Sequence, residues 1–261
     1  MTSLQRDFLI PDLEEVMRMS GVEGTVAVQA RQTMHETEWL LELAACHPFL
    51  LGVVGWVPLA DPNVAHNLDR FVRNTKLKAV RHVLHDEPDD FYMLRDDFSH
   101  GVSLLADVNL AYDILIFERH LSQSIEFVDR HPRQIFVVDH MAKPMIKAGA
   151  LWQWGEKVTE LAKRENVYCK VSGMATEADW SHWTSEQLRP YFDTVLSAFG
   201  PKRIMFGSDW PVLTLASSYS EWVDCFQSFI KELSQDEQEE ICCGTACRAY
   251  RLGDVSQRGN R

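Results

Sequence analysis

The chain has 261 residues, of which 46% are hydrophobic and 25% are charged, and these are ordinary proportions for a globular protein. The formal net charge is −12 at pH 7, which argues against a nucleic-acid partner because phosphate backbones are bound by clustered Lys and Arg. The length suits one α/β domain over residues 1–261. No apolar stretch is long enough to span a membrane, and residues 1–10 lack the apolar core of a signal peptide, so we expect a cytoplasmic protein without a membrane partner.

The sequence contains six cysteines and no C-x-x-C pair. In the absence of a secretory signal, six reduced thiols are the simplest interpretation. Cys243 and Cys247 are four residues apart on a predicted helix. A metal or redox pair there is an alternative that no neighbouring residue supports.

Short β-branched runs alternate with amphipathic runs along the first half of the chain. Compact apolar runs indicate strands, and apolar residues at helical spacing indicate helices. The predicted strands are Thr25 to Ala30, Gly52 to Val57 and Lys78 to Leu84. The predicted helices are Thr37 to His47, Asn63 to Arg73 and Asp90 to Asp107.

The second half of the chain repeats this alternation. The predicted strands are Ala111 to Ile116, Gln134 to Asp139, Val167 to Val171 and Arg203 to Phe206. The predicted helices are His120 to Arg130, Leu151 to Glu165 and Ser185 to Phe199. Two more helices close the chain, and the second begins with the capping-box pattern Ser234 to Glu237.

Apolar strands that alternate with helices predict a parallel sheet that is buried on both faces. We count seven strands, whereas a closed parallel barrel has eight. An open, doubly wound sheet is therefore the alternative to a barrel. The G-x-G-x-x-G fingerprint of dinucleotide-binding folds and the phosphate-binding G-x-x-x-x-G-K are both absent from the sequence.

Ionisable and hydrogen-bonding residues collect where the predicted strands end, and α/β folds place their chemistry there. Each such group costs desolvation free energy unless it is paired, so a purely structural protein has no need of them. The residues that we single out are Gln29, Arg81, His82, His140, Lys143, Lys170, Asp209 and Trp210. Together they predict a site at the carboxyl ends of the strands.

Several of these residues also have a purely structural interpretation. The structural alternative for Asp209 is a residue of a turn. The structural alternative for His140 is a buried histidine whose ring nitrogens are hydrogen-bonded. The structural alternative for Lys170 is an ion pair with an internal carboxylate, and for Lys143 it is an ordinary surface charge. The collective pattern is a stronger signal than any one member.

Arg81 and His82 are adjacent in a predicted strand, so their side chains point to opposite faces of the sheet. At most one of them faces the barrel interior directly. We favour His82 for that position.

Six segments in chain order carry a resemblance that spans nearly the whole chain. They are Thr37 to Phe49, Gly52 to Pro62, Ala79 to Pro88, Val137 to Pro144, Val167 to Trp180 and Arg203 to Val212. Together they resemble the amidohydrolase-related superfamily, and most closely its sugar-lactonase branch of L-fuconolactonase-like and L-rhamnonolactonase-like proteins. Any one segment would be a weak signal, and the set is specific for the branch but not for a substrate.

The resemblance implies a distorted TIM-type (β/α)8 barrel and a small-molecule substrate. The implied reaction is hydrolysis of a cyclic ester, a sugar aldonolactone such as a fuconolactone or rhamnonolactone. By the family pattern, Asp209 would be the general base on water, and His140 would polarise the carbonyl or bind the substrate. The residues expected to line the pocket are Gln29, Arg81, His82, Lys143, Lys170 and Trp210.

One feature of the superfamily is missing from the sequence. The superfamily normally opens with a strand that carries His-X-His and supplies two metal ligands, and no His-X-His occurs here. The simplest interpretation is an N-terminally shortened chain without the first strand of the barrel, and a genuine seven-stranded relative is the alternative. His140 and Asp209 alone are fewer than the three or four ligands of a typical zinc site. We therefore expect weak zinc binding or none, and no firm cofactor.

Two other functions remain open at this stage. A related decarboxylase or amide hydrolase would use the same barrel, because pocket loops decide the substrate. A catalytically impaired or non-catalytic barrel would instead have lost its chemistry with the first strand and would serve binding or regulation. The sequence does not decide between a monomer and an oligomer.

Overall fold

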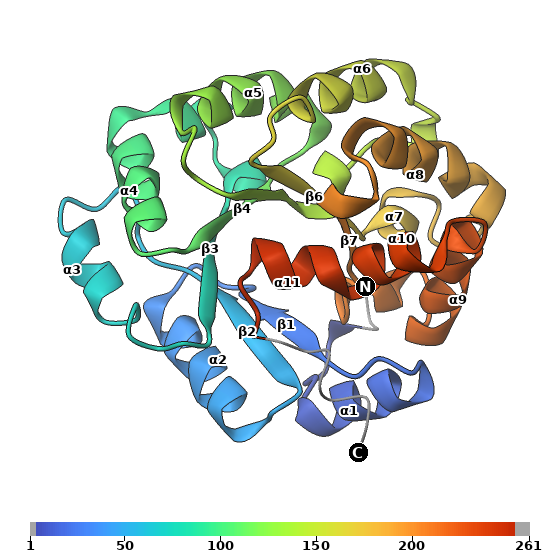
Figure 1. Cartoon of the computed structure of the whole chain (residues 1–261), viewed down its shortest axis with the longest axis horizontal. Coiled ribbons are helices and arrows are strands. Elements are labelled where there is room, and N and C mark those ends of the chain that lie inside the picture. Colours follow the sequence, from blue (N-terminus) through green and yellow to red (C-terminus); the bar gives the residue numbers. More distant parts are fainter. Residues whose placement is uncertain (1–3, 254–261) are drawn as a thin grey trace.

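The computed structural model of the chain describes residues 4–253. Its seven strands form one parallel sheet, and each strand pairs with its neighbours in the sequence. Figure 1 shows the sheet curling into an incomplete ring. The strands are β1 Thr25–Val28, β2 Leu50–Gly55, β3 Leu77–Val83, β4 Ala111–Leu115, β5 Phe136–Val138, β6 Val167–Val171 and β7 Ile204–Phe206. The prediction of a distorted TIM-type barrel with seven strands is confirmed.

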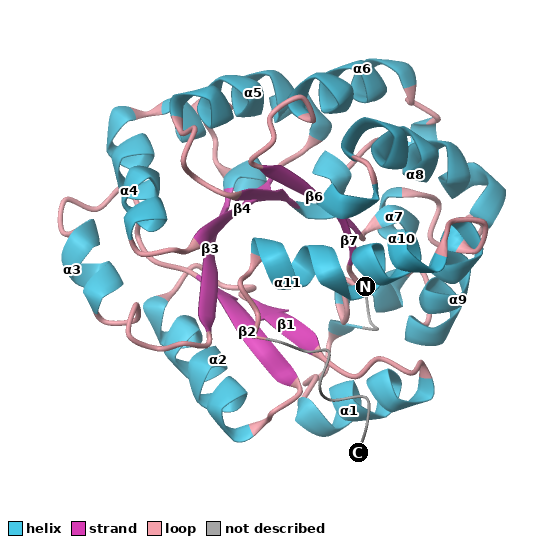
Figure 2. Cartoon of the chain, in the orientation of Figure 1, coloured by secondary structure: helices cyan, strands magenta, loops and turns pink. Residues whose placement is uncertain are grey.

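Most of the helices lie outside this ring and form an outer layer around the strands (Figure 2). The helices that precede β5 are α1 Ile10–Met19, α2 Met34–Cys46, α3 Val64–Asp69, α4 Asp96–Asp107 and α5 Leu121–Arg130. The later helices are α6 Trp152–Leu161, α7 Met174–Glu177, α8 Ser185–Phe199, α9 Tyr219–Ile230, α10 Gln235–Glu239 and α11 Thr245–Ala249.

The sequence did not predict α1 or α7. Helix α1 has apolar residues at helical spacing, Ile10, Leu13 and Met17, a signal that the sequence-based interpretation missed, and α7 has only four residues. The predicted final helix is also divided in the structure. Ser234 caps α10 as predicted, but a π-helical turn over Glu240–Gly244 then leads into α11.

Large aromatic side chains fill the space between the sheet and the outer helices. Phe98 of α4 and Phe127 of α5 contact Tyr112 of β4, with ring centroids 6.1 and 5.9 Å from the tyrosine ring. Phe136 of β5 contacts Phe127 at 5.5 Å. All four side chains are fully buried, so this cluster fixes the two helices on the middle of the sheet.

Small side chains line the inside of the sheet near the amino ends of the strands. Ala79 and Ala111 are partners in register, and together with Val137 they belong to an inner apolar cluster. Ala249 and Tyr250, at the end of α11, belong to the same cluster, and Figure 1 shows α11 lying across the centre of the ring. The small strand residues thus leave the space that α11 fills.

The lining changes from apolar to charged two residues further along the same strands. Arg81 and Asp113 are partners in register, and each follows an alanine of the inner cluster by two residues, so they share its face of the sheet. The hydroxyl of Tyr250 donates a hydrogen bond to Asp113 Oδ2 at 2.7 Å. Helix α11 is therefore connected directly to the charged layer.

The segment before β1 contacts the segment after β7. Helix α1 packs against α9, and Ser20 Oγ lies 3.1 Å from Ser220 Oγ. The ring of Phe8 meets Trp210 edge to face, with centroids 5.3 Å apart. Within residues 4–253, β1 and β7 are the two edge strands of the sheet.

Across residues 4–253, no helix has the length and apolar character that crossing a membrane requires. Residues 1–3 and 254–261 of the predicted domain lie outside the described residues. The organisation of residues 1–261 as one domain stays a prediction.

Replacing Tyr250 by Phe removes the hydroxyl that donates to Asp113. We expect the free energy of unfolding to fall by about 1–3 kcal/mol, because a buried carboxylate loses a hydrogen-bond donor. The matched control is Tyr191→Phe, since the buried Tyr191 hydroxyl has no hydrogen-bond partner among the described residues. Urea denaturation at pH 7 measures both variants, and equal losses would contradict the assigned role of the Tyr250 hydroxyl.

Candidate active site

Four charged side chains form a layer across the barrel interior. Lys170 Nζ, on β6, donates to Asp139 Oδ1 at 2.5 Å and to Asp113 Oδ2 at 3.1 Å. Arg81 Nη1, on β3, donates to Asp139 Oδ2 at 2.8 Å. Both carboxylates are fully buried. Two cations thus balance two carboxylates in a single network.

Burial and the neighbouring charges have opposing effects on the pKa values of the side chains in this layer. Burial opposes ionisation of Asp139, but Lys170 and Arg81 outweigh it and hold the pKa of Asp139 below its ordinary value. Burial dominates at Asp113 and raises its pKa to about 6, against the opposing effect of Lys170. Burial also opposes the charge on Lys170, yet the two carboxylates raise its pKa well above the ordinary value. At neutral pH, therefore, Asp139 is ionised and Lys170 is charged.

The expectation that His82 faces the barrel interior is wrong. Arg81 points inward to Asp139, so the adjacent His82 points outward to the helix layer. The His82 ring stacks on Tyr92 with centroids 5.2 Å apart, and its Nε2 lies 2.6 Å from Glu87 Oε1. A direct contact between His82 and a substrate stays a prediction.

Gln29 and Trp210 have other partners in the structure. Gln29 is fully buried, and its Nε2 donates to the main-chain oxygen of Arg81 at 3.1 Å. Arg81 Nη2 in turn donates to the main-chain oxygen of Gln29. Trp210 is half-buried against Phe8. The predicted roles of Gln29 and Trp210 in substrate binding stay predictions.

His140 and Asp209 come together where β5 and β7 end. His140 Nε2 lies 3.7 Å from Asp209 Oδ1, which is longer than a hydrogen bond. His140 Nδ1 lies 2.8 Å from Ser172 Oγ. Burial lowers the pKa of His140, and the charge of Asp209 opposes that effect without reversing it. The ring is therefore neutral at pH 7, and its Nδ1 atom is hydrogen-bonded to Ser172.

An unusual left-handed turn orients His140. The φ angles of His140, Met141, Ala142 and Lys143 are 51°, 52°, 59° and 48°. For residues other than glycine, this conformation costs about 1–2 kcal/mol each in a left-handed helix. Met141 and Ala142 are fully buried, and Trp154 Nε1 donates to the main-chain oxygen of Met141 at 2.8 Å. Packing and this hydrogen bond hold the turn.

Gly173 lies against the His140 side chain. Its φ is +68°, and a Cβ added there would lie 3.0 Å from His140 Cβ and 3.1 Å from His140 Nδ1. Both the backbone angle and the contact favour glycine. Asp209 also has a positive φ, of 56°, so both central residues of the site depend on left-handed backbone.

Lys143 is paired rather than free in solvent. Its Nζ lies 3.7 Å from Glu177 Oε1 and 5.2 Å from the ring centroid of Phe117. The Phe117 ring also contacts His85, with centroids 4.6 Å apart. Burial, helped by the charge of Lys143, lowers the pKa of His85 to about 4. Lys143 thus belongs to a second group of polar side chains near His140.

Among residues 4–253, no group of three or more His, Cys, Asp or Glu side chains is arranged to hold a metal ion. His140 and Asp209 supply two donors, and a typical zinc site uses three or four protein ligands. The described residues therefore do not make a complete zinc site.

Four residues of the site received no role from the sequence, namely Asp113, Asp139, Ser172 and Glu177. Asp113 and Asp139 follow Ala111 and Val137 of the inner cluster by two residues, and Ser172 follows Lys170 by two, so strand periodicity carries a signal for all three. Glu177 ends a short helix that the sequence did not predict, and no spacing rule identifies it.

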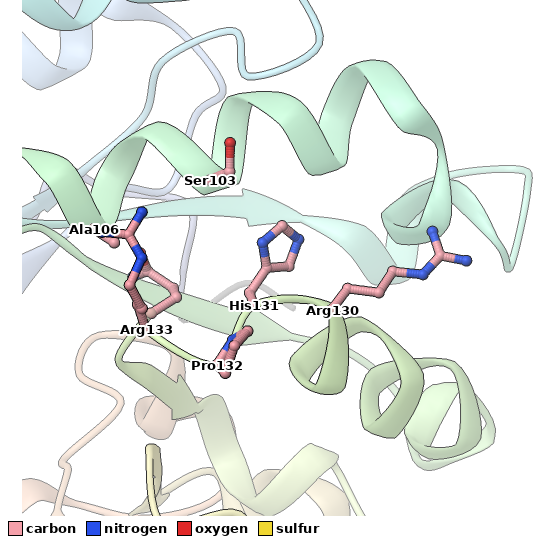
Figure 3. Close-up of a pocket in the computed structure, with 7 residues that line it drawn as sticks. Ser103, Ala106, Arg130, His131, Pro132 and Arg133 are labelled. Carbon is pink, nitrogen blue, oxygen red and sulfur yellow. The ribbon is translucent and has the colours of Figure 1, made fainter.

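A cavity of about 120 Å³ lies near the amino ends of β4 and β5, away from the strand ends described above (Figure 3). Its arginines already have partners. Arg133 pairs with Asp107 at 3.1 Å, and Arg130 pairs with Glu126 at 2.6 Å. None of the predicted site residues lines this cavity.

Residues 2–252 match the protein family described as Amidohydrolase. The L-fucono-1,5-lactonase of Burkholderia multivorans is 39% identical over 260 residues, covering 95% of this chain and 88% of that protein. The L-fucono-1,5-lactonase of Burkholderia ambifaria is 35% identical, covering 96% and 87%. A crystal structure of a Burkholderia multivorans amidohydrolase with bound Zn has a TM-score of 0.93 at 39% identity, covering 97% of this chain and 91% of that chain.

These similarities extend over almost the entire chain, and they confirm the resemblance that the six sequence segments indicated. The TM-score of 0.93 also agrees with the barrel fold. The chain belongs to the amidohydrolase family.

Proposed function

We propose that this chain hydrolyses a sugar aldonolactone of the L-fucono-1,5-lactone type. The observation that carries this proposal is the 39% and 35% identity, over nearly the full chain, to two L-fucono-1,5-lactonases. The site supports it with a carboxylate and a neutral histidine side by side above a layer that contains two cations.

In this proposal, Asp209 accepts a proton from the water that attacks the lactone carbonyl. The 3.7 Å between His140 Nε2 and Asp209 Oδ1 leaves room for one small group that contacts both side chains. We assign the Ser172 hydroxyl as the donor to His140 Nδ1 across their 2.8 Å contact, which places the hydrogen of the neutral ring on Nε2. That N–H donates to the carbonyl oxygen as it gains negative charge.

The cations provide a favourable potential for the carboxylate product. An ammonium group has three donors, and Asp113 and Asp139 use two of those on Lys170. We assign the third donor of Lys170, together with Arg81 and Lys143, to substrate and product. Trp210 forms part of the pocket wall in this arrangement.

Replacing Asp209 by Asn removes the proposed base and should lower turnover by about 10²–10⁴-fold. A pH-indicator assay against a panel of aldonolactones, with and without chelator, measures it, and the chelator arm decides whether a divalent cation contributes. Undiminished hydrolysis by the variant would remove Asp209 from this role. A non-catalytic barrel would give no hydrolysis by the wild type either.

Replacing Ser172 by Ala removes the partner of His140 Nδ1. We expect kcat/KM to fall about five- to tenfold, because a hydrogen bond of this kind contributes about 1 kcal/mol. Ser99→Ala is the matched control, since Ser99 Oγ lies 2.9 Å from His131 Nε2 in a serine–histidine pair outside the site. Equal effects of the two changes would argue against a specific role for Ser172.

A further inference from the structure

One proton transfer in the proposed hydrolysis has no residue assigned to it. When the tetrahedral intermediate collapses, the bond from the carbonyl carbon to the ring oxygen breaks. That oxygen leaves as an unactivated alkoxide unless a nearby acid protonates it. At that point Asp209 holds the proton of the attacking water and is one candidate donor, while His140 donates to the carbonyl oxygen.

Glu177 lies between the loop after β5, which carries His140, and the loop after β7, which carries Asp209. It is the last residue of α7. Helix α7 packs against the turn Val212–Leu215, which follows Asp209, and against the turn Ile146–Ala148, which follows Lys143. The Glu177 carboxyl lies 3.7 Å from Lys143 Nζ, and its side chain is 24% exposed. It is thus sheltered at the site while still accessible.

The surroundings of Glu177 favour its protonated form. Burial is the largest effect and raises the pKa of the carboxyl. Two charged groups act on it from neighbouring loops: Lys143 lowers the pKa and Asp209 raises it. Two carboxyls in one site with different environments form the arrangement that general acid–base catalysis uses.

We propose that Glu177 is the general acid that protonates the leaving ring oxygen, an inference that rests on the proposed lactone hydrolysis. The water oxygen bonds to the carbonyl carbon, and Asp209 takes a proton from that water. The bond from the carbonyl carbon to the ring oxygen then breaks, and the ring oxygen takes the proton of Glu177. The products are a hydroxyl and a carboxyl group, and solvent removes the proton from Asp209 and restores that of Glu177.

Two other groups are competing donors, namely the Lys143 ammonium group in the same cluster and Asp209 after it has taken the water proton. If Asp209 returns that proton, Glu177→Gln should behave like a control variant outside the site. The assignments to Glu177 and to Lys143 predict different effects of each side chain on the pH dependence of kcat/KM. If Glu177 is the acid, Lys143 lowers the pKa of Glu177 and contacts the product, but it supplies no proton to the leaving oxygen. If Lys143 is the acid, removing it removes the proton source.

The first test compares Glu177→Gln with Glu240→Gln. Glu240 is a matched control because it pairs with Arg248 outside the site and its side chain is 27% exposed. On L-fucono-1,5-lactone, we expect Glu177→Gln to lower kcat/KM by about 100-fold or more. On dihydrocoumarin, whose phenolate leaves without help, we expect a loss of less than about tenfold. Equal losses on the two lactones would overturn the proposal.

The second test is the pH dependence of kcat/KM. The decline at high pH, where Glu177 loses its proton, should disappear in Glu177→Gln. In Lys143→Met the same decline should move to higher pH, because the cation that lowers the pKa of Glu177 is gone. Disappearance of the decline in Lys143→Met, or its retention in Glu177→Gln, would overturn the proposal. These profiles decide the question even if the wild type does not accept dihydrocoumarin.

The wild type separates this inference from the proposed function. Failure of the wild type to hydrolyse any lactone of the panel would refute both. Hydrolysis by the wild type with Glu177→Gln indistinguishable from Glu240→Gln would refute only the role of Glu177. Melting temperatures of the two variants within a few degrees of each other show that the loss is not one of folding.

Discussion

The two ion pairs of Asp139 are the constraint on which the site depends. The Asp139 carboxylate forms ion pairs with Lys170 of β6 and Arg81 of β3. It therefore links these two strands to the end of β5 at one buried point. Taking one partner away would leave an uncompensated charge in the interior, which is strongly destabilising. Since His140 is the next residue, the left-handed turn starts from an anchored position, and Ser172 and Gly173 then determine where the ring lies.

The site combines a rigid part with a more variable part. Arg81 and Lys170 stand on strands, and their network fixes them. Lys143 lies in the segment after β5, and Glu177 ends the short helix α7 between β6 and α8. Such connecting segments tolerate sequence changes best. The strands thus fix the charged layer, while the proposed reacting groups His140, Asp209 and Glu177 lie beyond the strand ends.

Much of this arrangement was readable from the sequence, for reasons that differ between residues. Strand and helix periodicity gave the seven strands, and Val167–Val171 and Ser185–Phe199 match the structure at both ends. The same periodicity showed that Arg81 and His82 point apart, but it could not say which points inward. That choice depends on Asp139, a partner 58 residues away. Glu177 was missed because a four-residue helix has no periodic pattern, and its position comes only from tertiary packing.

The filling of the barrel by α11 has a consequence for how the chain folds. Tyr250 and Asp113 are 137 residues apart in the sequence, and contacts between such distant residues slow folding because a long loop must close first. The inner apolar cluster is complete only when Ala249 and Tyr250 join Ala79, Ala111 and Val137. Enclosure of the barrel interior therefore depends on pairing the middle of the chain with the last part that the structure describes, and this makes the fold one of high contact order.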